Sequence, residues 1–61
     1  MTRENLAIAY SLLVSLGLSE CYELYLHDSA HNVYLRDCNY RVYCRTTNLD
    51  ELCQAIRELA L

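Results

Sequence analysis

A near repeat of nine residues runs from position 25 to position 45, in the stretch YLHDSAHNVYLRDCNYRVYCR. Tyr25, Tyr34 and Tyr43 are spaced nine residues apart, and each is followed by Leu or Cys and then by His or Arg. A strand of about five residues and a hairpin loop of about four together take nine residues. The period therefore predicts a meander of strands joined by two short turns.

Three segments in and around this repeat alternate between apolar and polar residues, over residues 20–27, 32–37 and 40–45. They are rich in Tyr, Val and Leu, which favour strands, and a period of two gives each strand one apolar face. Asp28 and Asp37 begin the intervening stretches DSAH and DCNY, and Asp opens turns by accepting a downstream backbone N–H. The apolar positions predict one core face: Tyr22, Leu24, Leu26, Val33, Leu35, Val42 and Cys44.

A helix is predicted before the meander. It starts after Thr2, a good N-cap, and ends at Gly17, where a left-handed glycine would let Leu18 fold back onto Leu13 in a Schellman motif. The apolar stripe of this helix consists of Leu6, Ala9, Tyr10, Leu13 and Leu16, with Ile8 and Val14 outside it. Apolar residues outside the stripe indicate a helix that is covered on more than one side.

A second helix is predicted over residues 48–61. Asn48 and Glu51 match a capping box, in which each side chain accepts the backbone N–H of the other residue. One apolar stripe runs along this helix: Leu49, Leu52, Cys53, Ile56, Leu59 and Ala60.

The predicted order is helix, three-stranded antiparallel meander, helix. This is an α+β fold (αβββα), and its economical packing is a two-layer sandwich with both helices on one sheet face. We expect a single domain over residues 1–61, because one glycine, no proline and no low-complexity run leave no candidate linker. So short a chain has a core worth about 3–5 kcal/mol and little room for a substrate pocket. We therefore expect a protein that is not an enzyme.

Two equal loops, over residues 28–31 and 37–40, would bring the three tyrosines of the repeat into one row. This row would lie on the sheet face away from the helices. The residues predicted on this face for partner binding are Tyr25, Tyr34 and Tyr43, flanked by Arg36, Arg41 and Arg45.

This tyrosine–arginine face has three interpretations. It is an ordinary solvated sheet surface, since cross-strand aromatic pairs stabilise sheets. Alternatively it binds a protein, foreign or a second copy, since Tyr and Arg are enriched at interface hot spots. The third interpretation is a platform for unpaired RNA bases. The formal net charge of −3 places a protein partner ahead of nucleic acid.

The carboxylates of Asp50, Glu51 and Glu58 are predicted on the outer face of the second helix. Such a face keeps a small protein soluble. Carboxylates on a rigid body can also compete for basic grooves that hold nucleic acid, so these residues are a second candidate partner-binding surface.

Four cysteines and two histidines raise the question of a metal site. His27 and His31 have the H-x-x-x-H spacing, but the sequence has no C-x-x-C to complete a zinc site, and the cysteines are scattered singly. It also has no P-loop, dinucleotide fingerprint or nucleophile elbow. We therefore predict no metal, no cofactor and no catalytic residues. Cys44 and Cys53 fall on core faces. Cys21 and Cys38 share a row near the sheet end, which leaves plain thiols and a labile disulfide as alternatives.

The apolar run LAIAYSLLVSLGL, over residues 6–18, is too short to span a bilayer and lacks a following small-residue cleavage site. We interpret it as part of a core helix. The expected protein is cytoplasmic and makes no membrane contact.

In size, acidity and lack of a catalytic motif, the whole chain resembles the small phage-encoded inhibitors of host systems, the anti-CRISPR proteins among them. The resemblance implies stoichiometric binding to a host complex that handles nucleic acid or defends the cell, in the host cytoplasm. We therefore expect a non-enzymatic inhibitor or adaptor. An RNA- or single-strand-binding module is the alternative, and a homodimer that buries the tyrosine–arginine face is a third.

Overall fold

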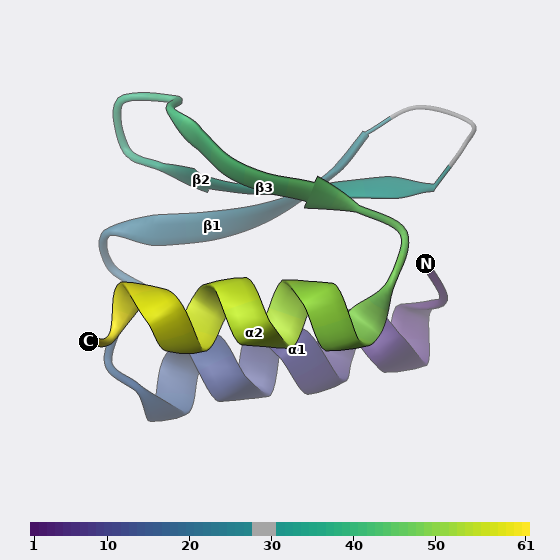
Figure 1. Ribbon diagram of the computed structural model, residues 1–61, viewed down its shortest axis with the longest axis horizontal. Helices are drawn as coiled ribbons and strands as arrows, with labels where there is room; N and C mark the ends of the chain where they lie inside the picture. Colours follow the sequence, from purple (N-terminus) through teal and green to yellow (C-terminus); the bar gives the residue numbers. More distant parts are fainter. Residues whose placement is uncertain (28–30) are drawn as a thin grey trace.

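The computed structural model describes residues 1–27 and 31–61. Its elements follow the predicted order, and the sheet is antiparallel with strand order β1-β2-β3. Figure 1 shows both helices beneath one face of the sheet, so the two-layer αβββα prediction is confirmed. The elements are α1 (Arg3–Ser15), β1 (Tyr22–His27), β2 (Asn32–Asp37), β3 (Val42–Thr46) and α2 (Leu49–Leu59).

Both ends of α1 are fixed by the predicted caps. The Thr2 hydroxyl oxygen accepts the Asn5 N–H at 3.1 Å. At the other end Gly17 has a φ of +73°, and the Leu18 N–H donates to the Leu13 carbonyl at 3.0 Å. With the Gly17 N–H bound to Val14, this is the complete hydrogen-bond pattern of a Schellman motif.

The cap of α2 is more elaborate than the predicted box. The Asn48 side chain accepts the Glu51 N–H at 3.1 Å, as expected. The return half passes through the buried hydroxyl of Thr46, which accepts the Asn48 N–H at 3.0 Å and donates to the Glu51 carboxylate at 2.6 Å. Glu51 is therefore tied into the joint between β3 and α2.

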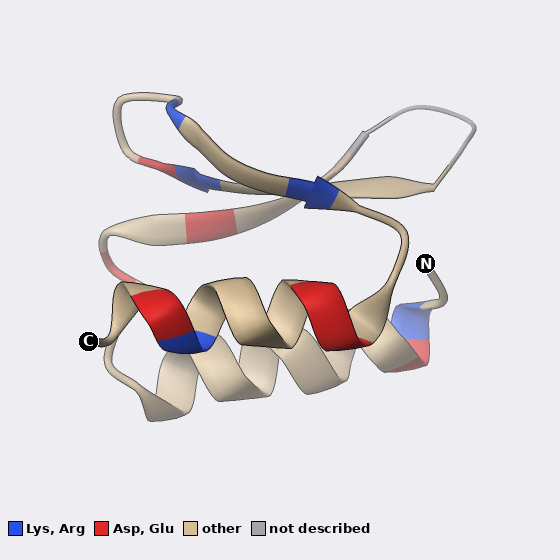
Figure 2. Ribbon diagram, in the orientation of Figure 1, with Lys and Arg blue, Asp and Glu red and all other residues tan. Residues whose placement is uncertain are grey.

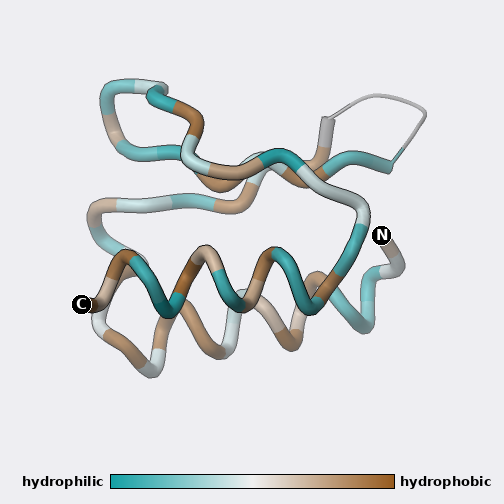
Figure 3. Tube along the Cα trace, in the orientation of Figure 1, coloured by the Kyte–Doolittle hydropathy of each residue, from teal (hydrophilic) through white to brown (hydrophobic). Residues whose placement is uncertain are grey.

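The core lies between the sheet and the two helices. The buried hydrophobic residues come from α1, β2 and α2, and partly buried side chains of β1 and β3 pack around them. Figure 3 shows α2 alternating between polar and apolar positions, whereas α1 has few hydrophilic positions beyond its first turn. The core residues are Ala9, Leu13, Val33, Leu35, Leu52, Cys53 and Ile56.

Much of the apolar surface of α1 stays outside this core. Tyr10 and Leu16, which the stripe predicts to be covered, are exposed, and so are Ile8 and Val14. Within the single chain, the sheet and α2 cover one side of α1. The prediction of a helix covered on more than one side is therefore wrong for the single chain.

The register between β1 and β2 is the predicted one along both strands. Leu24 pairs with Leu35, and Tyr25 pairs with Tyr34. The first predicted turn begins at Asp28, which lies outside the described residues. Agreement over all paired positions confirms the register predicted for this hairpin.

The register between β2 and β3 is displaced by two residues from the prediction. Tyr34 pairs with Arg45 and not with Tyr43, and Leu35 pairs with Cys44 and not with Val42. The predicted three-tyrosine row is therefore wrong.

Two local features produce the displacement. The Asp37 N–H donates to the Arg41 carbonyl at 3.0 Å, so the loop is the three residues 38–40, closed by a β-turn from Tyr40 to Asp37. Tyr40 has a φ of +64°, the left-handed residue that ends such three-residue loops. This loop shifts the pairing by one residue, and a bulge that leaves Tyr43 unpaired shifts it by one more.

The bulge also changes which side chains face the helices. Val42 pairs with Arg36 on the outer face and is 50% exposed, so its predicted core position is wrong. Tyr43 lies on the helix side instead, because its ring is 5.7 Å from that of Tyr22, which packs against the core.

Replacing Gly17 tests the Schellman motif. A Cβ at this position would meet nothing within 4 Å, so the cost of Gly17→Ala comes from the positive φ alone, about 1–2 kcal/mol. In a domain of this size each kcal/mol corresponds to about 4–8 °C in melting temperature, which circular dichroism would measure. Gly17→Asn is the matched control and should lose less, because Asn tolerates the left-handed region. Equal melting temperatures for Gly17→Ala and the parent would contradict this account.

Candidate functional site

The outer face of the sheet carries a cluster of aromatic and charged side chains from β1, β2, β3 and the second turn. The rings of Tyr25 and Tyr34 meet edge to face, with centroids 6.5 Å apart and an interplanar angle of 75°. Arg45 pairs with Tyr34 in the register, so it shares this face. We call the set the outer-face cluster: Glu23, Tyr25, Tyr34, Arg36, Tyr40 and Arg45.

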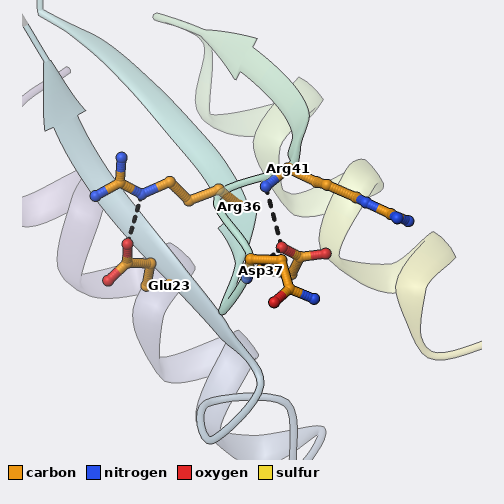
Figure 4. A network of polar contacts seen from close by, with 5 residues as sticks. Glu23, Arg36, Asp37 and Arg41 are labelled. Atoms are coloured by element: carbon orange, nitrogen blue, oxygen red, sulfur yellow. Dashed lines mark hydrogen bonds and ion pairs between the residues drawn. The ribbon is translucent and has the colours of Figure 1, made fainter.

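Arg36 is at the centre of the outer-face cluster. Its guanidinium carbon lies 4.1 Å from the ring centroid of Tyr25 and 5.0 Å from that of Tyr40. Its Nε donates to Glu23 Oε1 at 2.5 Å, an ion pair visible in Figure 4. The side chain is only 21% exposed. Arg36 is therefore held by two rings and a carboxylate, and its charge is largely balanced within the chain.

Tyr40 is a member of this cluster that the sequence did not indicate. It is 72% exposed, and its left-handed backbone in the turn brings its ring beside Arg36. The sequence places Tyr40 in a loop, and no periodicity signals a left-handed tyrosine. The only signal in the sequence is the preceding DCN, which favours a turn.

The carboxylate of Asp37 holds the turn that presents Tyr40. Oδ1 accepts the backbone N–H groups of Asn39 at 2.8 Å and Arg41 at 3.0 Å, and Oδ2 accepts the Tyr43 hydroxyl at 2.9 Å. These bonds favour the ionised form, so the pKa of Asp37 is lowered, with the Arg41 N–H as the largest cause. The pKa of Tyr43 is raised in turn, chiefly because its hydroxyl donates to Asp37.

Two residues predicted on the outer face are not brought into the cluster. Tyr43 lies on the helix side, against Tyr22. The side chain of Arg41 extends away from that of Arg36 in Figure 4, while its backbone closes the turn at Asp37. The tyrosine–arginine face therefore exists, but with Tyr40 in place of Tyr43 and with two of the three predicted arginines.

The predicted acidic surface on α2 is less continuous than its composition indicates. Figure 2 shows the acidic positions of α2 separated along the helix, with a basic position next to those near its C-terminal end. In the sequence Arg57 directly precedes Glu58. The Glu51 carboxylate is held by Thr46, and Glu58 accepts from the Gln54 amide at 3.4 Å. Asp50 and Glu58 are exposed.

The two cysteines predicted on core faces differ in burial. Cys53 is buried, and Cys44 is half-buried, with the pKa of its thiol raised first by burial and then by nearby carboxylates. Cys21 and Cys38 are both free and exposed, and both line a shallow surface pocket of about 190 Å³ at one end of the sheet. No group of three or more His, Cys, Asp or Glu side chains within residues 1–27 and 31–61 could hold a metal ion.

Comparisons with known proteins give no match: no protein-family model fits the chain, and neither the curated proteins nor the solved structures include a similar one. Neither helix of the described chain has the length and hydrophobicity needed to cross a membrane.

Acid should weaken the turn at Asp37. A carboxyl group whose pKa is lower in the folded protein contributes stability above its unfolded pKa, here near 3.8, and this is lost as the pH falls through the folded value. We therefore expect the melting temperature of the parent to fall between about pH 5 and pH 2.5. Asp37→Asn keeps one oxygen acceptor but has no charge to lose, so its decline should be smaller.

Tyr43→Phe is the matched control for this titration. It removes one of the three hydrogen bonds to Asp37 and keeps the ring against Tyr22, so its decline with pH should be intermediate. Parallel melting curves for the parent and Asp37→Asn over this pH range would show that the carboxylate does not anchor the turn.

Proposed function

We propose that this protein is a non-catalytic inhibitor or adaptor that binds a protein partner stoichiometrically through the outer-face cluster. The observation that supports it best is Arg36, whose guanidinium lies over the rings of Tyr25 and Tyr40 and is paired with Glu23. The class we propose is that of small phage-encoded inhibitors of a host complex, acting in the host cytoplasm, which agrees with the short acidic chain.

The cluster has the properties of an interface anchor. Tyr and Arg dominate interface hot spots, because they offer large contact areas. Here their side chains are already ordered by contacts with one another, so binding would cost less conformational entropy than ordering free side chains. Tyr40 and Val42 add exposed apolar area at the β3 side of the cluster. A partner with a flat, partly apolar surface fits these features.

The same contacts disfavour the nucleic-acid alternative. Base stacking needs an open ring face. The Arg36 guanidinium covers one face of Tyr25 and one face of Tyr40, and Tyr25 meets Tyr34 edge to face, so fewer ring faces are open to bases. Glu23 balances the charge that would otherwise attract phosphate. The overall net charge of −3 adds repulsion.

The acidic face of α2 is the second surface through which an inhibitor of this kind could bind. Mimicry of a nucleic-acid backbone requires a run of free carboxylates. Arg57 adds a positive charge directly before Glu58, and Glu51 serves the helix cap. Asp50 and Glu58 remain available to extend an interface, but we place its centre on the sheet.

Partner capture tests the cluster directly. The chain would be immobilised and exposed to extract from its source cell, and captured protein identified by mass spectrometry. For Arg36→Ala or Tyr40→Ala we expect a loss of affinity of about thirtyfold, the size of a hot-spot residue of about 2 kcal/mol. The control Arg57→Ala removes an exposed arginine from α2 and should bind like the parent. Full capture by Arg36→Ala, or loss with Asp50→Asn and Glu58→Gln instead, would move the site to α2.

Titration with labelled single-stranded RNA tests the alternative. At low ionic strength, where phosphate contacts are strongest, we expect no saturable binding. Saturable binding that weakens as salt is added and is lost in Arg45→Ala would contradict the proposed function.

A further inference from the structure

The two edges of the sheet differ in how they are protected against pairing. The β3 edge carries a bulge and two arginines, Arg41 and Arg45, features that discourage strand addition. The β1 edge has neither: its residues read YELYLH, with no bulge, no proline and no Lys or Arg. β1 is therefore the edge available to another strand.

The backbone groups that face the open edge of β1 follow from the ladder. In an antiparallel sheet the N–H and C=O of one residue point to the same side, and successive residues alternate. The Asp37 N–H donates to the Arg41 carbonyl on the β3 side. The backbone N–H and C=O groups of Arg36 and Tyr34 therefore point toward β1. The backbone groups of the β1 residues paired with them point back toward β2. The backbone N–H and C=O of Leu24 and Leu26 therefore face the open edge.

A second observation supports this parity. The Tyr22 N–H donates to the Leu18 carbonyl at 3.0 Å, away from β2. The backbone groups of Tyr22, Leu24 and Leu26 therefore point toward the same side of β1. The N–H of Tyr22 is already hydrogen-bonded. A strand that adds to β1 finds complete pairs of donors and acceptors at Leu24 and Leu26.

An apolar groove runs beside this edge. Its volume is about 330 Å³, and it is lined by Leu24 of β1 and by Leu6, Ala7 and Tyr10 of α1, with Arg3 at one end. Tyr10 is 52% exposed, and the neighbouring inner-face residue Leu26 is 46% exposed. α1 packs against β1 and α2 against β3, so the exposed apolar residues that line this groove lie at the β1 side.

We infer that the β1 edge binds the β1 edge of a second copy, in an antiparallel register that pairs Leu24 with Leu26. By two-fold symmetry this pairing occurs twice, and each pair makes two backbone hydrogen bonds. Tyr25 meets its own copy on the two-fold axis, on the outer face. This register uses the facing groups of Leu24 and Leu26 and does not need the occupied N–H of Tyr22.

The occupant is a second copy because the surface is complementary to itself. Rotation about the axis brings Leu24 opposite Leu26 on the inner face, apolar against apolar. It also brings each α1 toward the other, so that the two grooves face one another. A stable interface needs about 800 Å² from each partner, about a fifth of the 4235 Å² surface of this chain. Burial of exposed α1 residues in such an interface supplies the second cover that the apolar pattern of α1 requires.

The result is a continuous sheet of six strands, three from each copy, with all helices on one face and both outer-face clusters on the other. The inference does not depend on the proposed function, since self-association can be measured without any partner.

Sedimentation equilibrium of the full chain under reducing conditions tests the pairing. We expect a mass twice the 7.1 kDa of the chain. Leu26→Lys puts a charge opposite Leu24 at a position that is half exposed in the single chain, so it should halve the mass and leave the circular dichroism spectrum unchanged. Val42→Lys is the matched control: it changes an equally exposed apolar residue on β3 and should remain dimeric. A parent that is monomeric at millimolar concentration, or a dimer that survives Leu26→Lys, overturns the inference.

Cross-linking tests the register. In a Cys21→Ser, Cys38→Ser background, Tyr25→Cys places two thiols across the axis in a non-hydrogen-bonded pair, where the Cβ atoms approach to about 4.5–5.5 Å. Mild oxidation should give a covalent dimer. Tyr34→Cys is on the same face of the central strand and should not cross-link. Cross-linking of Tyr34→Cys and not of Tyr25→Cys would place the contact on the outer face instead, and the β1 edge would be excluded.

Discussion

The carboxylate of Asp37 determines where the third strand lies. It accepts the N–H groups of Asn39 and Arg41 and the Tyr43 hydroxyl, and together these bonds close a loop of three residues. Because Arg41 closes the loop against Asp37 and not against Arg36, each β2 residue meets a later residue of β3 than a four-residue loop would give. The same loop holds Tyr40 in the left-handed region and sets its ring beside Arg36. The composition of the outer-face cluster therefore depends on one turn.

Several acidic side chains among the described residues make their contacts within the chain. Glu23 is paired with Arg36, Asp37 anchors the second turn, and Glu51 is bound by Thr46 at the start of α2. Although the net charge is −3, several carboxylates thus stabilise local structure within the chain. This explains why the cluster can contain arginines and still present a nearly balanced surface, and why the acidic face of α2 is discontinuous. Both effects favour recognition by shape and aromatic contact over recognition by charge.

The sequence was sufficient for those features that local chemistry determines. Thr2, Gly17 and Asn48 mark the helix ends, and the alternating pattern sets the pairing of β1 with β2. It was insufficient where one residue departs from the usual preference of its type. A left-handed Tyr40 is uncommon for a non-glycine residue, and its effect on the register is as large as that of the bulge. Once the register moved, Tyr43 and Val42 exchanged sides, while Tyr25, Tyr34 and Arg36 kept theirs because they belong to the first hairpin.

The apolar groove beside α1 and the outer-face cluster meet at β1. This strand contributes Glu23 and Tyr25 to the outer-face cluster and Leu24 to the groove beside α1. Pairing of two β1 edges would place Tyr25 of each copy on the axis, so that the two clusters form one continuous surface. A partner that contacts both copies would then bind the dimer more tightly than the single chain. By linkage, the same partner would stabilise the dimer by an equal free energy. Self-association and partner binding would therefore be coupled through one strand, the first through its open edge and the second through its outer face.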